Sequence, residues 1–81
     1  MSVARIKLNA VDDVRHFVKE AEKCNYDVDV SYDRVFVDAK SLLGVMSMDL
    51  NHVLTVSYHE DDIHFANAIA KYAVEPKTQY L

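Results

Sequence analysis

The stretch K-S-L-L-G-V-M-S-M at residues 40–48 does most to decide the fold of this 81-residue chain. Ser41 stands where a short helix would begin, because serine is a favoured N-cap whose hydroxyl satisfies an otherwise unpaired backbone N–H. The apolar residues that follow are too many for a short helix to bury on one face. Some should pack against a sheet, with Gly44 and Val45 facing inward. The others should form a contact surface, for which we nominate Leu42, Leu43, Met46 and Met48.

Alternating apolar and polar residues on both sides of this helix predict four strands. Residues 28–32 alternate clearly, the pair at 33–34 can form a tight turn, and residues 35–37 provide the returning arm of a hairpin. Residues 53–58 are rich in strand-forming side chains. The stretch at 4–8 alternates between apolar and basic residues and gives the first strand.

Two longer helices are predicted from apolar residues at helical spacing. The first covers residues 11–21, with Asn9 or Asp12 as its N-cap. The second is opened by the acidic residues 60–62, whose charge suits the positive end of a helix dipole, and it is stopped by Pro76. Its apolar residues are Ile63, Ala66, Ile69, Ala70 and Ala73.

The resulting order is β-α-β-β-α-β-α, in one domain at residues 1–75 with a loose tail at 76–81. Strands mixed with helices in so small a unit predict an α+β protein of two layers, a sheet with its helices on one face. We expect the first and fourth strands side by side in the middle of that sheet. The other face should meet water, which explains the polar residues Asp27, Asp29 and Ser31.

Composition excludes several classes of function. The net charge of −4 argues against nucleic-acid binding, and one glycine with one proline leaves no glycine-rich phosphate loop. A single cysteine, Cys24, forms no internal disulfide and is expected to be a buried packing residue near a helix end. No apolar run is long enough to cross a membrane and no signal peptide is recognisable, so the expected location is the cytoplasm.

The element order and residues 40–48 together resemble the phosphocarrier protein HPr of the bacterial sugar phosphotransferase system. That family shows a stretch close to K-S-I-M-G-V-M-S-L at the start of its second helix, and six of the nine letters agree here. The resemblance implies an HPr-like open-faced β-sandwich, with a four-stranded antiparallel sheet and three helices on one face. It also implies two functional places: a loop with a phosphate-accepting histidine and an arginine before the first helix, and a serine that a kinase phosphorylates in many Gram-positive members.

The sequence departs from the family at the first of these places. Residues 8–13 contain no histidine, arginine or proline, and Asp12 and Asp13 stand where the family has a cation. Carboxylates would repel the phosphoryl group that such a site must hold. Ser41, the counterpart of the family's regulatory serine, is retained.

His16 lies about two turns inside the first helix, and His52, His59 and His64 are interpreted as solvated surface residues. No ligand set for a metal or a cofactor is recognisable, and paired carboxylates have no evident cleft in which to do acid–base chemistry, so we do not expect an enzyme.

Three hypotheses for the function follow. The first is an HPr-like protein that regulates by contact through the Ser41 helix, with Ser41 as a possible kinase target. Its partners would be phosphotransferase or regulatory proteins: a kinase, an enzyme I-like protein, a permease subunit or a transcription regulator. The second is a phosphocarrier that uses a non-classical histidine such as His16. The third is an orphan structural or interaction domain.

Overall fold

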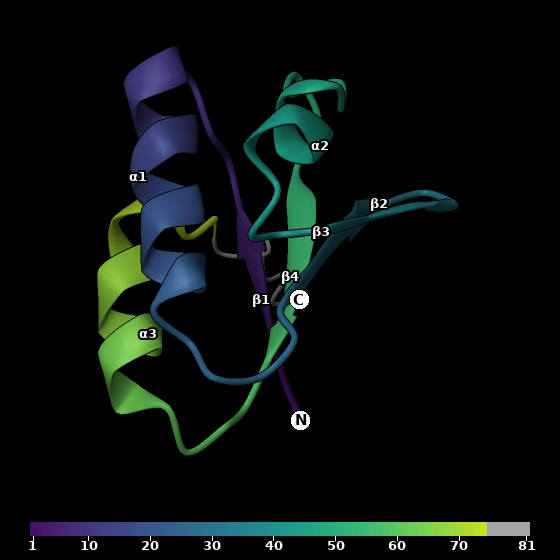
Figure 1. Cartoon of the computed structure of the whole chain (residues 1–81). Coiled ribbons are helices and arrows are strands. Elements are labelled where there is room, and N and C mark those ends of the chain that lie inside the picture. Colours follow the sequence, from purple (N-terminus) through teal and green to yellow (C-terminus); the bar gives the residue numbers. More distant parts are fainter. Residues whose placement is uncertain (75–81) are drawn as a thin grey trace, which may run out of the picture.

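The computed structural model describes residues 1–74 and folds them into a four-stranded sheet with helices on one face (Figure 1). The strands are β1 (Ser2–Ile6), β2 (Asp29–Tyr32), β3 (Val35–Asp38) and β4 (Leu54–Tyr58). The helices are α1 (Val11–Glu22), α2 (Leu42–Met46) and α3 (Ile63–Ile69), followed by the short 3-10 helix η1 (Ala70–Tyr72). The α+β class and the element order are as predicted. Pro76 and the predicted tail at 76–81 lie outside the described residues.

All neighbouring strands run antiparallel, in the order β1-β4-β2-β3. β1 and β4 are paired as predicted, but β1 does not lie in the middle, because β2 takes the other side of β4. The end of η1 and the residues after it cover part of the outer edge of β1. There the Lys7 N–H donates to the Tyr72 carbonyl at 2.9 Å, and the Val74 N–H donates to the Arg5 carbonyl at 2.8 Å.

The hydrophobic core lies between the helices and one face of the sheet. In Figure 1, α1 and α3 lie side by side, and the sheet lies beside them on the right. Phe17 of α1 and Phe65 of α3 are buried to 0% and 1% exposure, and their ring centroids are 6.3 Å apart. Each such side chain contributes about 1.5–3 kcal/mol to folding through burial. The sheet contributes Ile6, Val30, Leu54 and Val56 to the same core.

The β2–β3 hairpin closes with the two-residue turn at Asp33-Arg34, as predicted. Tyr32 pairs with Val35 across the turn, and Asp33 adopts a positive φ of 53°. Aspartate tolerates this left-handed conformation better than most residues that have a side chain. The hairpin therefore forms although its turn contains no glycine.

The start of α1 differs from the prediction. Its N-cap is Ala10, not Asn9 or Asp12, and alanine has no side-chain acceptor to offer. Instead the Asp13 carboxylate reaches back and accepts the backbone N–H groups of Asn9 and Ala10, at 3.1 and 3.3 Å. The helix start is thus stabilised by a carboxylate in its first turn.

The last predicted helix also differs from the prediction. The Asp62 carboxylate caps α3 by accepting the Phe65 N–H at 2.9 Å, so the helix begins at the acidic stretch as expected. It ends at Ile69, however, and Ala73 is extended and bridges to Ile6. Ile63, which we expected on the apolar face, is 69% exposed, and Phe65 fills the inward position.

Candidate functional site

Ser41 forms the N-cap of α2, as its position predicted. Its Oγ accepts the Gly44 N–H at 3.0 Å, and its own N–H donates to the Asp38 carbonyl at 3.0 Å. Gly44 makes room for this arrangement, because a Cβ at that position would stand 3.0 Å from the Ser41 Oγ and 3.2 Å from its Cβ. Ser41 and Gly44 therefore depend on each other locally, and the serine hydroxyl remains only partly buried.

Three of the four nominated apolar residues lie at the surface of α2. Leu43 is 83% exposed, Met46 is 41% exposed and Leu42 is 38% exposed. We call these three residues the α2 apolar surface. An exposed leucine by itself is ordinary, but three neighbouring exposed apolar side chains on a five-residue helix are typical of a contact surface.

Met48 does not belong to this surface. It is only 5% exposed and belongs to the hydrophobic core. The reason is that α2 ends at Met46, after which the Met48 N–H donates to the Val45 carbonyl and the chain turns inward. Val45 is fully buried, as predicted.

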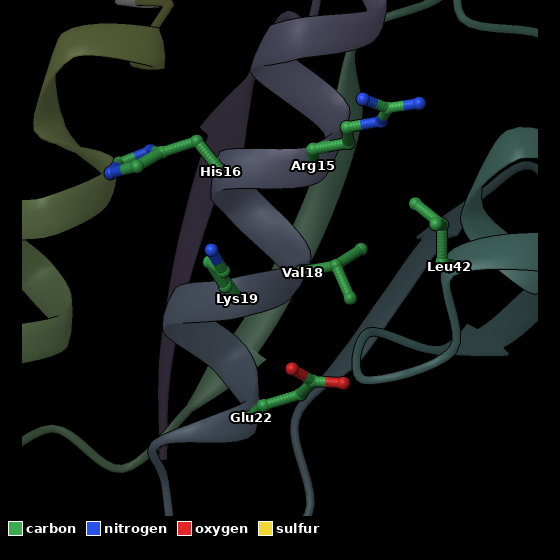
Figure 2. A pocket seen from close by; sticks show the side chains of 6 residues that line it. All are labelled: Arg15, His16, Val18, Lys19, Glu22 and Leu42. Carbon is green, nitrogen blue, oxygen red and sulfur yellow. The ribbon is translucent and has the colours of Figure 1, made fainter.

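A groove of about 470 Å³ lies between α1 and α2, next to the α2 apolar surface. Figure 2 shows Val18 of α1 and Leu42 of α2 facing each other across it, with Arg15 toward one end and Glu22 toward the other. The sequence interpretation missed this groove. A pattern in the sequence could have indicated it, because the residues of α1 that line the groove, apart from His16, recur at helical spacing: Arg15, Val18, Lys19 and Glu22.

His16 points away from Leu42, toward η1 (Figure 2). Its Nδ1 lies 2.7 Å from the Tyr72 hydroxyl, and its Nε2 lies 3.7 Å from Glu20 Oε2. Burial raises the pKa of the Tyr72 hydroxyl, so this group stays protonated. Both ring nitrogens of His16 thus have neighbours within the fold.

Residues 8–13 form the end of the loop before α1 and the first turn of that helix. Leu8 is buried, and the N–H groups of Asn9 and Ala10 that could bind an anion already donate to Asp13. An internal carboxylate therefore already uses the backbone donors at the start of α1. The loss of a classical phosphohistidine site at this loop stays a prediction from the sequence.

Two of the other histidines and Cys24 contact neighbouring residues within the fold. His59 stacks on Tyr26 with centroids 3.6 Å apart, and His52 stacks on Tyr32 at 4.6 Å. Both histidines are nevertheless exposed, as predicted. Cys24 is buried as predicted, and burial raises the pKa of its thiol. Within residues 1–74, no group of three or more histidines, cysteines or carboxylates is arranged to hold a metal ion.

The comparisons with known proteins show the family and the fold. Residues 13–74 match the family described as PTS HPr component, phosphorylation site, and the chain therefore belongs to the HPr phosphocarrier family of the phosphotransferase system. The match includes Ser41 and α2. It begins at Asp13, after most of the loop that lacks the histidine.

Solved structures give the same fold. The chain is similar to HPr-C-His from Thermoanaerobacter tengcongensis, with a TM-score of 0.67 and 26% identity over 88% of this chain and 89% of that one. It also shares the fold of a phosphocarrier protein HPr from Bacillus anthracis str. Ames, with a TM-score of 0.60 and 21% identity over 88% and 95% of the two chains. No curated protein sequence matches.

Among residues 1–74, no helix has the length and apolar character needed to cross a membrane.

Proposed function

We propose that this HPr-family protein acts as a regulator by protein–protein contact through the α2 apolar surface in the cytoplasm, and that phosphorylation of Ser41 changes that contact. The single observation that carries the proposal is the 83% exposure of Leu43, two residues from the Ser41 cap. Covering this surface with a partner would remove apolar area from water, which favours association. The groove beside it adds cationic Arg15 and Lys19, which favour a partner with carboxylates at its rim.

Ser41 is suited to a kinase because its hydroxyl is partly exposed and lies at the start of α2. A kinase would transfer the γ-phosphoryl group of ATP to Oγ: the new O–P bond forms, ADP leaves, and the hydroxyl proton is released. The phosphate oxygens could then accept the Gly44 N–H that Oγ accepts now. Phosphorylation would place up to two negative charges beside the α2 apolar surface and change which partners bind.

Contact and modification are tested separately. Binding of enzyme I from the same organism is measured by calorimetry for the wild type, for Leu43→Ser and for Ile63→Ser. Ile63 is a matched control, since it is an aliphatic residue with 69% exposure on a different helix. We expect Leu43→Ser to weaken binding at least tenfold, about 1.4 kcal/mol, and Ile63→Ser to leave it unchanged. Equal binding by all three proteins would refute the contact proposal.

Modification is tested by incubation with an HPr kinase and ATP, followed by mass spectrometry. We expect one phosphate on the wild type and none on Ser41→Ala. Absence of phosphate on the wild type would refute the kinase proposal while leaving the contact proposal standing.

The phosphocarrier alternative through His16 is tested with enzyme I and labelled phosphoenolpyruvate. Because both ring nitrogens of His16 lie near Tyr72 and Glu20, a phosphoryl group could bind only after the ring leaves these neighbours. We expect no label on the protein. Label that is acid-labile, base-stable and lost in His16→Ala would establish the phosphocarrier role in its place.

The orphan-domain alternative predicts no specific partner at all. It is supported if neither enzyme I nor the kinase binds, and if wild type and Ser41→Asp retain no protein from an extract of the same organism. Retention by the wild type that is lost in Leu43→Ser would exclude it.

A further inference from the structure

The side chain of Lys40 connects the chain that leads into α2 with the end of α1. Its Nζ donates to the Cys24 carbonyl at 2.8 Å, across 16 positions of sequence. Lys40 stands directly before Ser41, the N-cap of α2, and Cys24 directly follows Lys23, the C-cap of α1. Glu22, toward one end of the groove in Figure 2, is close to Cys24 in the chain, so the bond lies near that end.

The Cys24 carbonyl is a suitable acceptor for a cation. Carbonyls at the end of a helix have no partner inside it and lie at the negative end of the helix dipole, where lysine side chains bind favourably. Cys24 is buried and Lys40 is half-buried, so water competes little for this hydrogen bond. A bond that a charged donor makes in such surroundings is stronger than the same bond in water.

The backbone of Lys40 is fixed as well as its ammonium group. The Lys40 N–H donates to Asp38 Oδ1 at 2.9 Å. The Ala39 N–H donates to the Val28 carbonyl at 2.8 Å, which holds the preceding residue against the chain that enters β2. The side chain of Lys40 therefore starts from an anchored backbone and ends on an anchored carbonyl.

This bond is the directional link between the two walls of the groove. Within residues 1–74, no other hydrogen bond or ion pair joins residues 11–24 to residues 38–48. The remaining contact between α1 and α2 is packing, with Val45 of α2 in the same hydrophobic core as Val14 and Val18 of α1. The hydrophobic effect is non-directional, so burial alone does not fix how a five-residue helix is oriented.

We propose that Lys40 is a positioning residue of the α2 site, whose bond to the Cys24 carbonyl sets the spacing between α1 and α2. That spacing holds the α2 apolar surface across the groove from Arg15 and Lys19. Lys40 acts through α2, not by touching the partner. Its effect on partner binding rests on the contact function proposed above, whereas its effect on the free protein does not.

The test compares three variants with the wild type. Lys40→Met keeps much of the apolar stem and removes the donor, whereas Lys40→Arg keeps a cationic donor. Lys23→Met is the matched control, because it removes a cation at the same end of α1 whose Nζ bonds to Glu20 and not toward α2.

The first measurement is amide hydrogen exchange of the free proteins at Ser41 and Val45, whose N–H groups donate to the Asp38 and Ser41 carbonyls. We expect exchange about fivefold faster in Lys40→Met, and within about twofold of the wild type in Lys40→Arg and Lys23→Met. Val56 in β4 is the internal reference. Unchanged exchange at Ser41 and Val45 in Lys40→Met, or an equal increase at Val56, would overturn the positioning role.

The second measurement is calorimetric binding of enzyme I from the same organism. We expect Lys40→Met to bind about fivefold more weakly, with binding restored in Lys40→Arg and unchanged in Lys23→Met. Weaker binding of Lys40→Met without faster exchange would mean that Lys40 contacts the partner itself, which contradicts the proposal. A wild type that does not bind enzyme I refutes the contact function, and the exchange rates of the free proteins then still decide the role of Lys40.

Discussion

Replacing Ser41 by alanine tests the cap on which the α2 site is built. The substitution removes the Oγ that accepts the Gly44 N–H at 3.0 Å and leaves that donor without its acceptor. Loss of a serine N-cap costs about 1 kcal/mol, within a range of about 0.5–2 kcal/mol. For a domain of this size, 1 kcal/mol lowers Tm by about 4–8 °C.

Thermal unfolding followed by circular dichroism measures this change directly. Ser41→Asp is the matched control, because its carboxylate can accept the same N–H and suits the positive end of the helix dipole. We expect Ser41→Asp to keep the Tm of the wild type within about 2 °C, well inside the loss expected for alanine. A Tm for Ser41→Ala equal to that of the wild type would refute the reasoning, because the cap would then contribute nothing.

Three further outcomes are expected. Met48→Ala should destabilise the fold by about 2–5 kcal/mol because Met48 is buried, whereas Leu43→Ala should change stability by less than about 0.5 kcal/mol. Chemical denaturation measures both free energies of unfolding, and equal losses would contradict the assignment of Met48 to the core and Leu43 to the surface. Gly44→Ala should raise the free energy of unfolding by less than the roughly 1 kcal/mol that alanine gains over glycine in a helix, because the new Cβ crowds the Ser41 hydroxyl. A rise in Tm that corresponds to the full gain of about 1 kcal/mol would show that there is no crowding. The hydrogen bond from the Phe65 N–H, together with that from the Tyr26 hydroxyl, lowers the pKa of Asp62 below its ordinary value of 3.8. The stability that ionised Asp62 gives the fold is therefore complete above pH 3.8, and it is lost as the pH falls through the lower folded-state pKa. Denaturant unfolding across acidic pH should show a shallower loss for Asp62→Asn than for the control Asp61→Asn, and identical profiles would argue against this link.

Much of the fold follows from local patterns in the sequence. Two-residue alternation located the hairpin at residues 28–37, and the Ser41 cap was recognisable from residue type and position. The resemblance in residues 40–48 then placed these elements in a known order, and the family match at 13–74 confirms it. These features are determined by neighbours a few residues apart, which is why the sequence alone reveals them.

The errors concern features that depend on distant parts of the chain. Met48 looked like part of an exposed surface, but the turn after α2 carries it into the core. Ile63 and Phe65 are both apolar, and only the packing against Phe17 decides which faces inward. Asp13 reaches back to the start of α1, so the N-cap itself needed no polar side chain.

The groove between α1 and α2 was missed for the same reason. Arg15 and Lys19 are ordinary surface residues in a sequence, and they become part of a candidate site only when Leu42 is folded against α1 (Figure 2). The contact function is therefore argued from three-dimensional neighbours of Ser41, which residue patterns could not supply.

The most direct test of the contact proposal is a titration of the isotope-labelled protein with enzyme I, followed through its backbone amide resonances. We expect the largest shifts at Leu42, Leu43 and Met46, with smaller shifts at Arg15 and Lys19 across the groove. Repeating the titration with protein phosphorylated on Ser41 should change the affinity. Shifts confined to the open face of the sheet, or an unchanged spectrum at saturating enzyme I, would contradict a contact function for the α2 apolar surface.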